Sequence, residues 1–307
     1  MYSFSDVDLN LDHTLDCGQV FRWELEGGWW VGVVNGNVIR ARHDIESSTV
    51  LVDSSLPREF IASYFRLEDN LPLVLDSIDK DRYIREAIRK YRGLRLIRQD
   101  PWECMISYML ATASSIPTIK MRISLLSRMF GEKIGEGFYS FPDATSLANA
   151  CESDICECKL GFRTVRIQRA AQRVADGEFC FEKLFEMDYH DARVRLMEIE
   201  GIGEKVADCI LLFSIDKMES FPVDTHVRQV VEKYYSGDEY FGVGGNVSVG
   251  GSVSVGGSVS VGGSVSVGSG VNSKLNNHKM GEWGRRYFGE YCGYAQEYLY
   301  YCWRMRG

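Results

Sequence analysis

The first eighty residues show the alternation of apolar and polar side chains that is typical of β-strands. In residues 19–25 the alternate positions are apolar and would share one face of a strand: Phe21, Trp23 and Leu25. A Gly-Gly pair at 27–28 and an Asn-Gly pair at 35–36 are hairpin-turn signals. The pattern predicts an antiparallel sheet, with helices over 57–65 and 71–78 lying on it.

From residue 81 onward the apolar positions recur at helical spacing. Asp100 followed by Pro101 provides an N-cap and a first-turn proline for a helix that reaches Met109. Further helices are expected over 118–130, 143–150, 163–175, 188–197, 283–291 and 294–305. The chain is therefore predicted to be α+β. An N-terminal antiparallel β-sheet domain with helices, residues 1–80, precedes a two-lobed all-α body, residues 81–307.

A low-complexity segment at about 241–272 interrupts this body. It repeats Gly-Gly-Ser-Val-Ser-Val with a period of six and carries no charged residue after Phe241. Gly and Ser at this density favour a flexible loop, whereas Val-Ser-Val alternation would also suit a small stack of β-strands. We expect a loop insertion without a catalytic function.

Composition excludes several classes of protein. No apolar run approaches the roughly 18 residues that a membrane span requires, and the acidic N-terminus lacks a signal-peptide pattern. The nine cysteines contain no C-x-x-C pair, which favours buried thiols over a metal cluster or a disulfide framework. We therefore expect an intracellular protein with no membrane partner, no metal and no cofactor.

The net charge of −8 argues against a nucleic-acid partner, but its distribution changes that picture. Residues 1–79 hold 5 Lys or Arg against 14 Asp or Glu, so the remaining chain is close to neutral. Eight basic residues lie between Lys80 and Arg98, and a second basic group comprises Arg163, Arg166, Arg169 and Arg173. Local potential steers a polyanion, so either group could face nucleic acid. The alternative is that both are solvated helix faces.

Residues 196–210 predict a helix, a tight Gly201-Ile202-Gly203 hairpin and a second helix with Lys205 in its first turn. Such a reversal leaves backbone N–H groups pointing outward together, which is a ready phosphate site. Downstream, Asp224 is placed to cap a third helix. A phosphate site, a lysine and a carboxylate together suggest chemistry on a nucleic acid. Asp208 could pair with Lys205 across one turn, and the sequence leaves this open.

This combination resembles the helix–hairpin–helix DNA glycosylases and, among them, the 8-oxoguanine DNA glycosylase/AP lyases. The matching stretches run from Leu11 to about Arg304, at 15–23, 94–101, 160–163, 196–226 and 293–296. The resemblance implies a helix–hairpin–helix glycosylase body and a duplex DNA substrate that contains oxidised guanine. It also implies excision of the flipped base through a lysine Schiff base, followed by strand cleavage by β-elimination.

The resemblance also implies roles for individual residues. Lys205 would be the nucleophile, and Asp224 the carboxylate that meets the developing positive charge at C1′. Base recognition is implied for Gly18, whose carbonyl would accept the N7 hydrogen of 8-oxoguanine, for Gln296 at the Watson–Crick edge, and for Cys209 and Tyr300 as the walls that sandwich the ring. DNA contacts are implied for Phe162 as a wedge, Arg163 at the opposite base, Gly201, Gly203 and His226.

One turn departs from the family pattern. Where the family has an asparagine-rich turn and a nearby arginine that help to recognise the opposite cytosine, this chain has residues 113–118, Ala-Ser-Ser-Ile-Pro-Thr. Of that set of opposite-base contacts only Arg163 remains. We therefore expect a weaker preference for cytosine opposite the lesion.

Three other interpretations stay open. The pocket walls could select another damaged purine, or the chain could be a non-catalytic helix–hairpin–helix DNA-binding module. A structural protein built around the repeat would leave the pocket residues unexplained. Lys205 with Asp224 favours catalysis, because a binding module requires neither side chain. We expect a monomer associated with DNA, in the cytoplasm or nucleoid, or in the nucleus if the source is eukaryotic.

Overall fold

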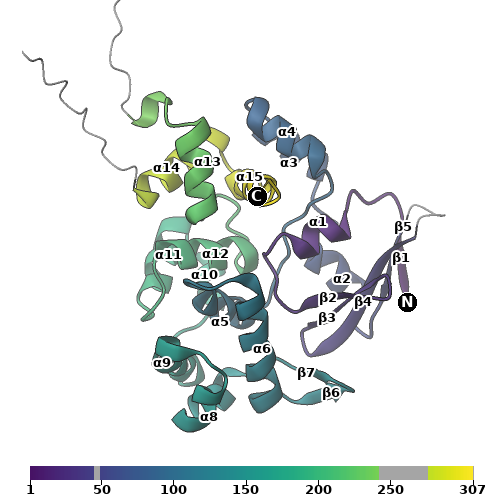
Figure 1. The fold of residues 1–307 in the computed structure, drawn as a ribbon, viewed down its shortest axis with the longest axis vertical. Coiled ribbons are helices and arrows are strands. Elements are labelled where there is room, and N and C mark those ends of the chain that lie inside the picture. Colours follow the sequence, from purple (N-terminus) through teal and green to yellow (C-terminus); the bar gives the residue numbers. More distant parts are fainter. Residues whose placement is uncertain (45–48, 242–275, 307) are drawn as a thin grey trace, which may run out of the picture.

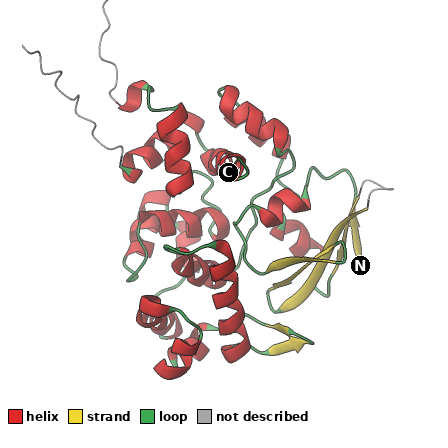
Figure 2. Cartoon of the chain, viewed as in Figure 1, coloured by secondary structure: helices red, strands yellow, loops and turns green. Residues whose placement is uncertain are grey.

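The computed structural model describes residues 1–44, 49–241 and 276–306, and shows a sheet beside a larger body of helices (Figures 1 and 2). The predicted α+β class with an N-terminal antiparallel sheet is confirmed. Apart from Phe241, the predicted insertion at about 241–272 lies outside the described residues. Of the described helices, none has both the length and the apolar character needed to cross a membrane.

The sheet has five antiparallel strands in the order β1-β5-β4-β3-β2. Their bounds are Tyr2–Phe4 (β1), Trp23–Glu26 (β2), Trp29–Val34 (β3), Asn37–Asp44 (β4) and Thr49–Asp53 (β5). Both predicted hairpin turns are present. Positive φ angles of +56° at Gly27, +79° at Gly28, +46° at Asn35 and +68° at Gly36 are those of a two-residue hairpin connection.

The predicted strand over 19–25 is wrong in its first half. The Gln19 side chain is buried and holds the backbone before Trp23 as a loop, because its amide donates to the carbonyl of Arg95 (2.8 Å) and accepts from the backbone N–H of Ile97 (2.8 Å). Trp23 is 1% exposed, but Leu25 is 58% exposed and does not share its environment. Trp23 packs over Gly32, where a Cβ atom would lie 2.5 Å from the indole.

Two helices pack with the sheet, α1 (Leu11–Asp16) and α2 (Arg58–Tyr64). The prediction that residues 71–78 also lie on the sheet is wrong. This helix, α3 (Leu71–Ile78), turns its apolar stripe of Leu71, Val74, Leu75 and Ile78 into the core of the helical body, where it contacts α15 (Cys292–Arg304). The domain division at residue 80 stays a prediction.

The remaining elements build the body. They are α4 (Arg82–Lys90), α5 (Pro101–Ala111), α6 (Ile116–Phe130), α7 (Ala144–Ala148), α8 (Glu152–Glu157), the 3-10 turn η1 (Gly161–Arg163), α9 (Thr164–Ala175), α10 (Glu182–Glu186), α11 (Tyr189–Met197), α12 (Glu204–Ser214), α13 (Thr225–Tyr234), η2 (Glu239–Phe241) and α14 (Asn277–Phe288). A short antiparallel hairpin, β6 (Lys133–Gly135) with β7 (Phe138–Tyr139), extends from the end of α6. The predicted Asp100 cap is present, since its carboxylate accepts from the N–H of Glu103 at 2.8 Å.

Some members of the two basic groups are paired inside the fold, and others are exposed. Arg95 is 3% exposed and donates to the carbonyls of Asp8, Arg66 and Asp69. Arg98 pairs with Glu68 and Asp216, which joins the first eighty residues to the body. On α9 the arginines pair with acidic side chains, among them Glu200 and Glu198 near the hairpin. Several of these arginines are therefore paired within the fold, whereas Arg89 and Lys90 on α4 are exposed. Whether either group faces nucleic acid stays a prediction.

Candidate active site

The helix–hairpin–helix is formed by α11, a turn at residues 198–203 and α12. Gly201 has φ +96°, and a Cβ atom there would lie 2.9 Å from the Arg166 side chain, so the fold itself requires glycine. Gly203 is the N-cap of α12 with an extended backbone, and a Cβ atom there would meet nothing within 4 Å. Because no side chain caps this helix, its first N–H groups are open to an external acceptor such as a phosphate.

Asp208 does not pair with Lys205, which answers the question that the sequence left open. It is 4% exposed and accepts hydrogen bonds from the Tyr189 hydroxyl (2.7 Å) and from Nε of Arg193 (2.9 Å). Burial raises the pKa of Asp208, and Arg193 opposes that shift. This buried pair ties α11 to α12 and so holds the two arms of the hairpin together.

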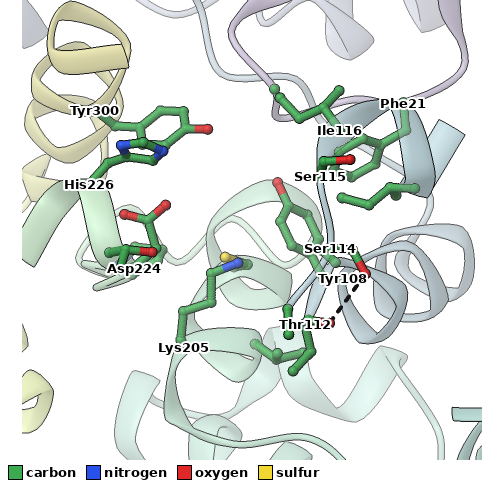
Figure 3. A pocket seen from close by; sticks show the side chains of 18 of the residues that line it. Phe21, Tyr108, Thr112, Ser114, Ser115, Ile116, Lys205, Asp224, His226 and Tyr300 are labelled. Atoms are coloured by element: carbon green, nitrogen blue, oxygen red, sulfur yellow. Dashed lines mark hydrogen bonds between the residues drawn. The ribbon is translucent and has the colours of Figure 1, made fainter. Parts of the chain in front are cut away.

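Lys205 and Asp224 face a common cleft of roughly 1550 Å³, which is large enough for a nucleobase together with its sugar (Figure 3). Nζ of Lys205 lies 5.2 Å from the ring centre of Tyr108, and no described carboxylate forms an ion pair with it. Asp224 also caps α13, since its Oδ1 accepts from the N–H of Val227 at 2.8 Å. The predicted cap is therefore present, and the same carboxylate borders the cleft.

The four predicted base-recognition residues line this cleft from distant parts of the chain. Cys209 is 3% exposed on α12, and burial raises the pKa of its thiol to about 12, with Lys205 opposing the shift. Gln296 is 5% exposed on α15, and its Oε1 has no partner among the described residues. Tyr300 follows one turn later, and burial raises the pKa of its hydroxyl.

Gly18 stands opposite Tyr300, in the loop that follows α1. Its φ is +101°, and a Cβ atom there would lie 3.1 Å from Ile116 and 3.4 Å from the Tyr300 hydroxyl. A side chain at this position would therefore be strained and would narrow the cleft. The guanidinium of Arg304 fixes the loop by donating to the carbonyls of Asp16 (2.8 Å) and Cys17 (2.7 Å).

The predicted DNA-contact residues do not all line the cleft. Gly201, Gly203 and His226 line the cleft, and the His226 ring packs edge-on against Tyr300 at 5.7 Å. Phe162 lies outside the cleft and is 62% exposed, beside the guanidinium groups of Arg163 (4.2 Å) and Arg166 (5.6 Å).

Arg163 also lies outside the cleft and is turned inward. It is 5% exposed and donates to the carbonyl of Thr112 and to the hydroxyl of Ser114 (3.2 Å). Arg122 of α6 donates to the same hydroxyl at 2.7 Å. Two guanidinium groups therefore converge on the turn that departs from the family pattern.

The cleft residues that sequence reasoning missed include Tyr108, Glu297 and Arg304. Glu297 is 3% exposed on an otherwise largely apolar helix. A charged residue next to Gln296 in such a helix could have indicated a residue of the site. Arg304 lies one turn beyond Tyr300 and could have been found from that spacing. In the described parts of the chain, no group of three or more His, Cys, Asp or Glu side chains could hold a metal ion.

Glu297 is expected to make the protein less stable at neutral than at mildly acidic pH. Burial raises the pKa of Glu297 from 4.5 to about 7; the nearby Asp224 charge adds to the shift, and Cys17, Arg304 and Lys205 oppose it. The folded state therefore binds more protons than the unfolded state between these values, so the free energy of unfolding falls as pH rises through about 7.

Glu297→Gln removes this titration. Between pH 5 and pH 8, wild type should lose about 2 to 3 kcal/mol of unfolding free energy relative to the variant. Urea unfolding of both proteins at the two pH values measures the difference. Parallel pH profiles for wild type and variant would contradict the expectation.

Comparisons with known proteins show similarity to this chain in both sequence and fold. The family described as "8-oxoguanine DNA glycosylase, N-terminal domain" matches residues 1–105. The N-glycosylase/DNA lyase OGG1 of Arabidopsis thaliana is 28% identical over 76% of this chain and 68% of its own length. The 8-oxoguanine glycosylase/lyase of Clostridium acetobutylicum, solved with double-stranded DNA that has cytosine opposite 8-oxoguanine, has a TM-score of 0.81 and 27% identity, covering 98% and 93% of the two chains.

A further solved structure, MBOgg1 in complex with a low affinity DNA ligand, has a TM-score of 0.82 and is 30% identical. The alignment covers 99% of this chain and 95% of that one. Together with the hairpin, its lysine and the aspartate across the cleft, these likenesses define a helix–hairpin–helix DNA glycosylase. Within that class, the chain belongs to the 8-oxoguanine DNA glycosylase family.

Proposed function

We propose that this protein excises 8-oxoguanine from duplex DNA and then cleaves the strand as an AP lyase. The observation that carries the proposal is the position of Lys205, which has no described carboxylate partner and faces the same cleft as Asp224. The family to which the chain belongs supports the same activity. We propose Lys205 as the nucleophile and Asp224 as the carboxylate that stabilises positive charge on the sugar.

In the first step the C1′–N9 bond breaks and its electron pair leaves with the base, which takes up a proton. The uncharged amine of Lys205 forms a bond to C1′, while the Asp224 carboxylate stabilises the oxocarbenium-like charge. The C1′–O4′ bond then opens, O4′ gains a proton, and the amine nitrogen loses one, which leaves a protonated Schiff base.

In the second step the Schiff base makes the hydrogens on C2′ acidic. Removal of one of them forms a C2′–C3′ double bond and expels the 3′ phosphate, which breaks the strand. Water then hydrolyses the Schiff base and returns Lys205 to its starting state. No redox partner is needed, because the bonding pairs of the broken C1′–N9, C1′–O4′ and C3′–O bonds leave with the base, with O4′ and with the phosphate, and the elimination and hydrolysis involve no net oxidation or reduction.

We propose that Gly18, Gln296, Cys209 and Tyr300 hold the flipped base. The low exposure of Cys209 and Gln296 supports this, because buried polar groups that face a cleft favour a ligand over solvent. For the DNA backbone we propose Gly201, Gly203 and His226 at phosphates, and Phe162 as the wedge that fills the vacated stack. Phe162 is an exposed aromatic side chain, which suits insertion between bases.

The proposed function is tested on a duplex that carries one 8-oxoguanine. The protein should release the free base and leave a nick whose 3′ end bears the unsaturated sugar of β-elimination. A matched duplex with 3-methyladenine tests the alternative of another damaged purine and should yield far less product. Tight binding to either duplex without base release would support the non-catalytic module and contradict the proposal.

Excision is expected to depend only weakly on the base opposite the lesion. Ala113 has φ +50°, a conformation that asparagine adopts more readily than alanine, and the turn that it begins offers hydroxyls in place of amides. A lost base contact of about 1–3 kcal/mol reduces discrimination by roughly 5- to 150-fold. Single-turnover excision rates opposite each of the four bases measure this, and a strong preference for cytosine would refute it.

We further propose that the protein acts as a monomer, since one chain supplies the complete set of cleft residues. As a DNA-repair enzyme it acts where the genome lies: in the cytoplasm and nucleoid, or in the nucleus if the source is eukaryotic.

A further inference from the structure

Helix α15 places two consecutive polar side chains in the wall of the cleft. Gln296 is 5% exposed and Glu297 is 3% exposed, and both line the cleft. The Oε1 atoms of both side chains are buried and have no hydrogen-bond partner among the described residues. Buried acceptors are rarely left unpaired, because desolvation without a partner is unfavourable. Two adjacent free acceptors therefore indicate a ligand that brings two donors.

The surroundings of Glu297 do not satisfy that oxygen. The titratable and charged groups near it are Cys17 on the loop after α1, Lys205 and Cys209 on α12, Asp224 before α13, Tyr108 on α5, and Tyr300 and Arg304 on α15. Arg304 is already engaged with the carbonyls of Asp16 and Cys17. No ion pair joins Glu297 to a described lysine or arginine. The Cys17 thiol interacts with the carboxyl group, but Oε1 has no hydrogen-bond partner among the described residues and remains available to a ligand in the cleft.

We propose that Glu297 is a further base-recognition residue, whose Oε1 accepts a hydrogen bond from the 2-amino group of the flipped 8-oxoguanine. This inference rests on the proposed function. The Watson–Crick edge of the base offers two neighbouring donors, N1–H and the 2-amino group, whereas the Gln296 amide has a single acceptor oxygen. Glu297 supplies the second acceptor from the next residue of the same helix.

This arrangement makes a chemical prediction about substrates. A purine lesion with two donors on its Watson–Crick edge satisfies both oxygens, whereas a lesion with one donor leaves one of them buried and unpaired. The contact does not require an ionised carboxyl group, because a protonated carboxyl group keeps an acceptor oxygen. Glu297 would therefore favour guanine-type over hypoxanthine-type and adenine-type lesions.

The test compares two duplexes, one with 8-oxoguanine and one with 8-oxohypoxanthine, which lacks the 2-amino group. Single-turnover excision rates are measured on both for wild type, Glu297→Gln and Glu297→Leu. Wild type and Glu297→Gln, which both carry the acceptor, should prefer 8-oxoguanine by roughly 5- to 150-fold, as expected for one buried hydrogen bond. In Glu297→Leu the ratio should fall to about 1.

The ratio of two rates within one preparation is independent of the fraction of folded enzyme, so a destabilised variant still gives a decisive result. A wild-type ratio retained in Glu297→Leu would overturn the inference, as would a wild-type enzyme that excises both bases equally well. In either of those cases the proposed function stands. Wild type that releases neither base would contradict both.

Discussion

Lys205→Gln is expected to abolish base excision and strand cleavage together, by on the order of 10³-fold or more. Glutamine has nearly the length of lysine but no nucleophilic amine, so no bond to C1′ can form. Because no described carboxylate pairs with Lys205, the replacement breaks no ion pair and should leave the fold intact. Excision and nicking assays on the 8-oxoguanine duplex measure the loss, and the melting temperature checks the fold.

Lys183→Gln is the matched control for this variant. Lys183 lies on α10, exposed and outside the cleft, so the same change of charge should leave both activities at the wild-type level. The Lys205→Gln protein should still bind the duplex, because only the reacting amine is removed. Excision that persists in Lys205→Gln at more than about a tenth of the wild-type rate would show that the lysine is not the nucleophile.

Asp224→Asn is expected to lower the excision rate by about 100- to 1,000-fold, the range found when one preorganised electrostatic contact to a transition state is removed. Asparagine caps a helix as well as aspartate does, so α13 should keep its N-cap and its stability. The variant therefore separates the two uses of this carboxylate. Single-turnover excision and thermal unfolding are measured on the same preparation.

The matched control is Asp188→Asn, because Asp188 caps α11 in the same way, accepting from the N–H of Asp191 at 2.9 Å, and does not line the cleft. It should change neither rate nor stability. A wild-type excision rate in Asp224→Asn would remove the carboxylate from the reaction and leave only its role as a cap.

Local patterns predicted the elements that short-range chemistry determines. The two hairpin turns, the Asp100 cap, the Asp224 cap and the Gly201 reversal follow from residues within a few positions of one another. The pairing of β2 with β3 and of β3 with β4 follows from those turns. The fold class could therefore be predicted from the sequence.

Features that depend on distant partners could not be predicted in this way. The strand over 19–25 was overextended because the buried bonds of Gln19 reach Arg95 and Ile97, some 76 to 78 positions away. The helix at 71–78 was assigned to the wrong core, because its apolar stripe shows that one face is buried but not which core that face packs against. The carboxylate partners of Arg98 and Arg169 could not be predicted, because Asp216 and Glu200 lie elsewhere in the chain.

The residues of the candidate site likewise divide into those that local sequence predicts and those that depend on distant contacts. The lysine, the aspartate and the hairpin lie within one stretch of thirty residues, and the family resemblance supplied Gly18, Gln296 and Tyr300 from outside it. Glu297 and Arg304 were missed because their roles arise from the approach of α15 to the loop at Gly18. The inward turn of Arg163 toward Thr112 likewise depends on a contact 51 residues away.

The central claim is that Lys205 forms the covalent bond to the sugar. The most direct measurement is borohydride reduction of the protein during its reaction with the 8-oxoguanine duplex, followed by digestion and mass mapping of the adduct. The account predicts one trapped complex, with the sugar attached to the peptide that contains Lys205. Base release without a trapped complex, or an adduct on Lys120, which also lines the cleft, would contradict it.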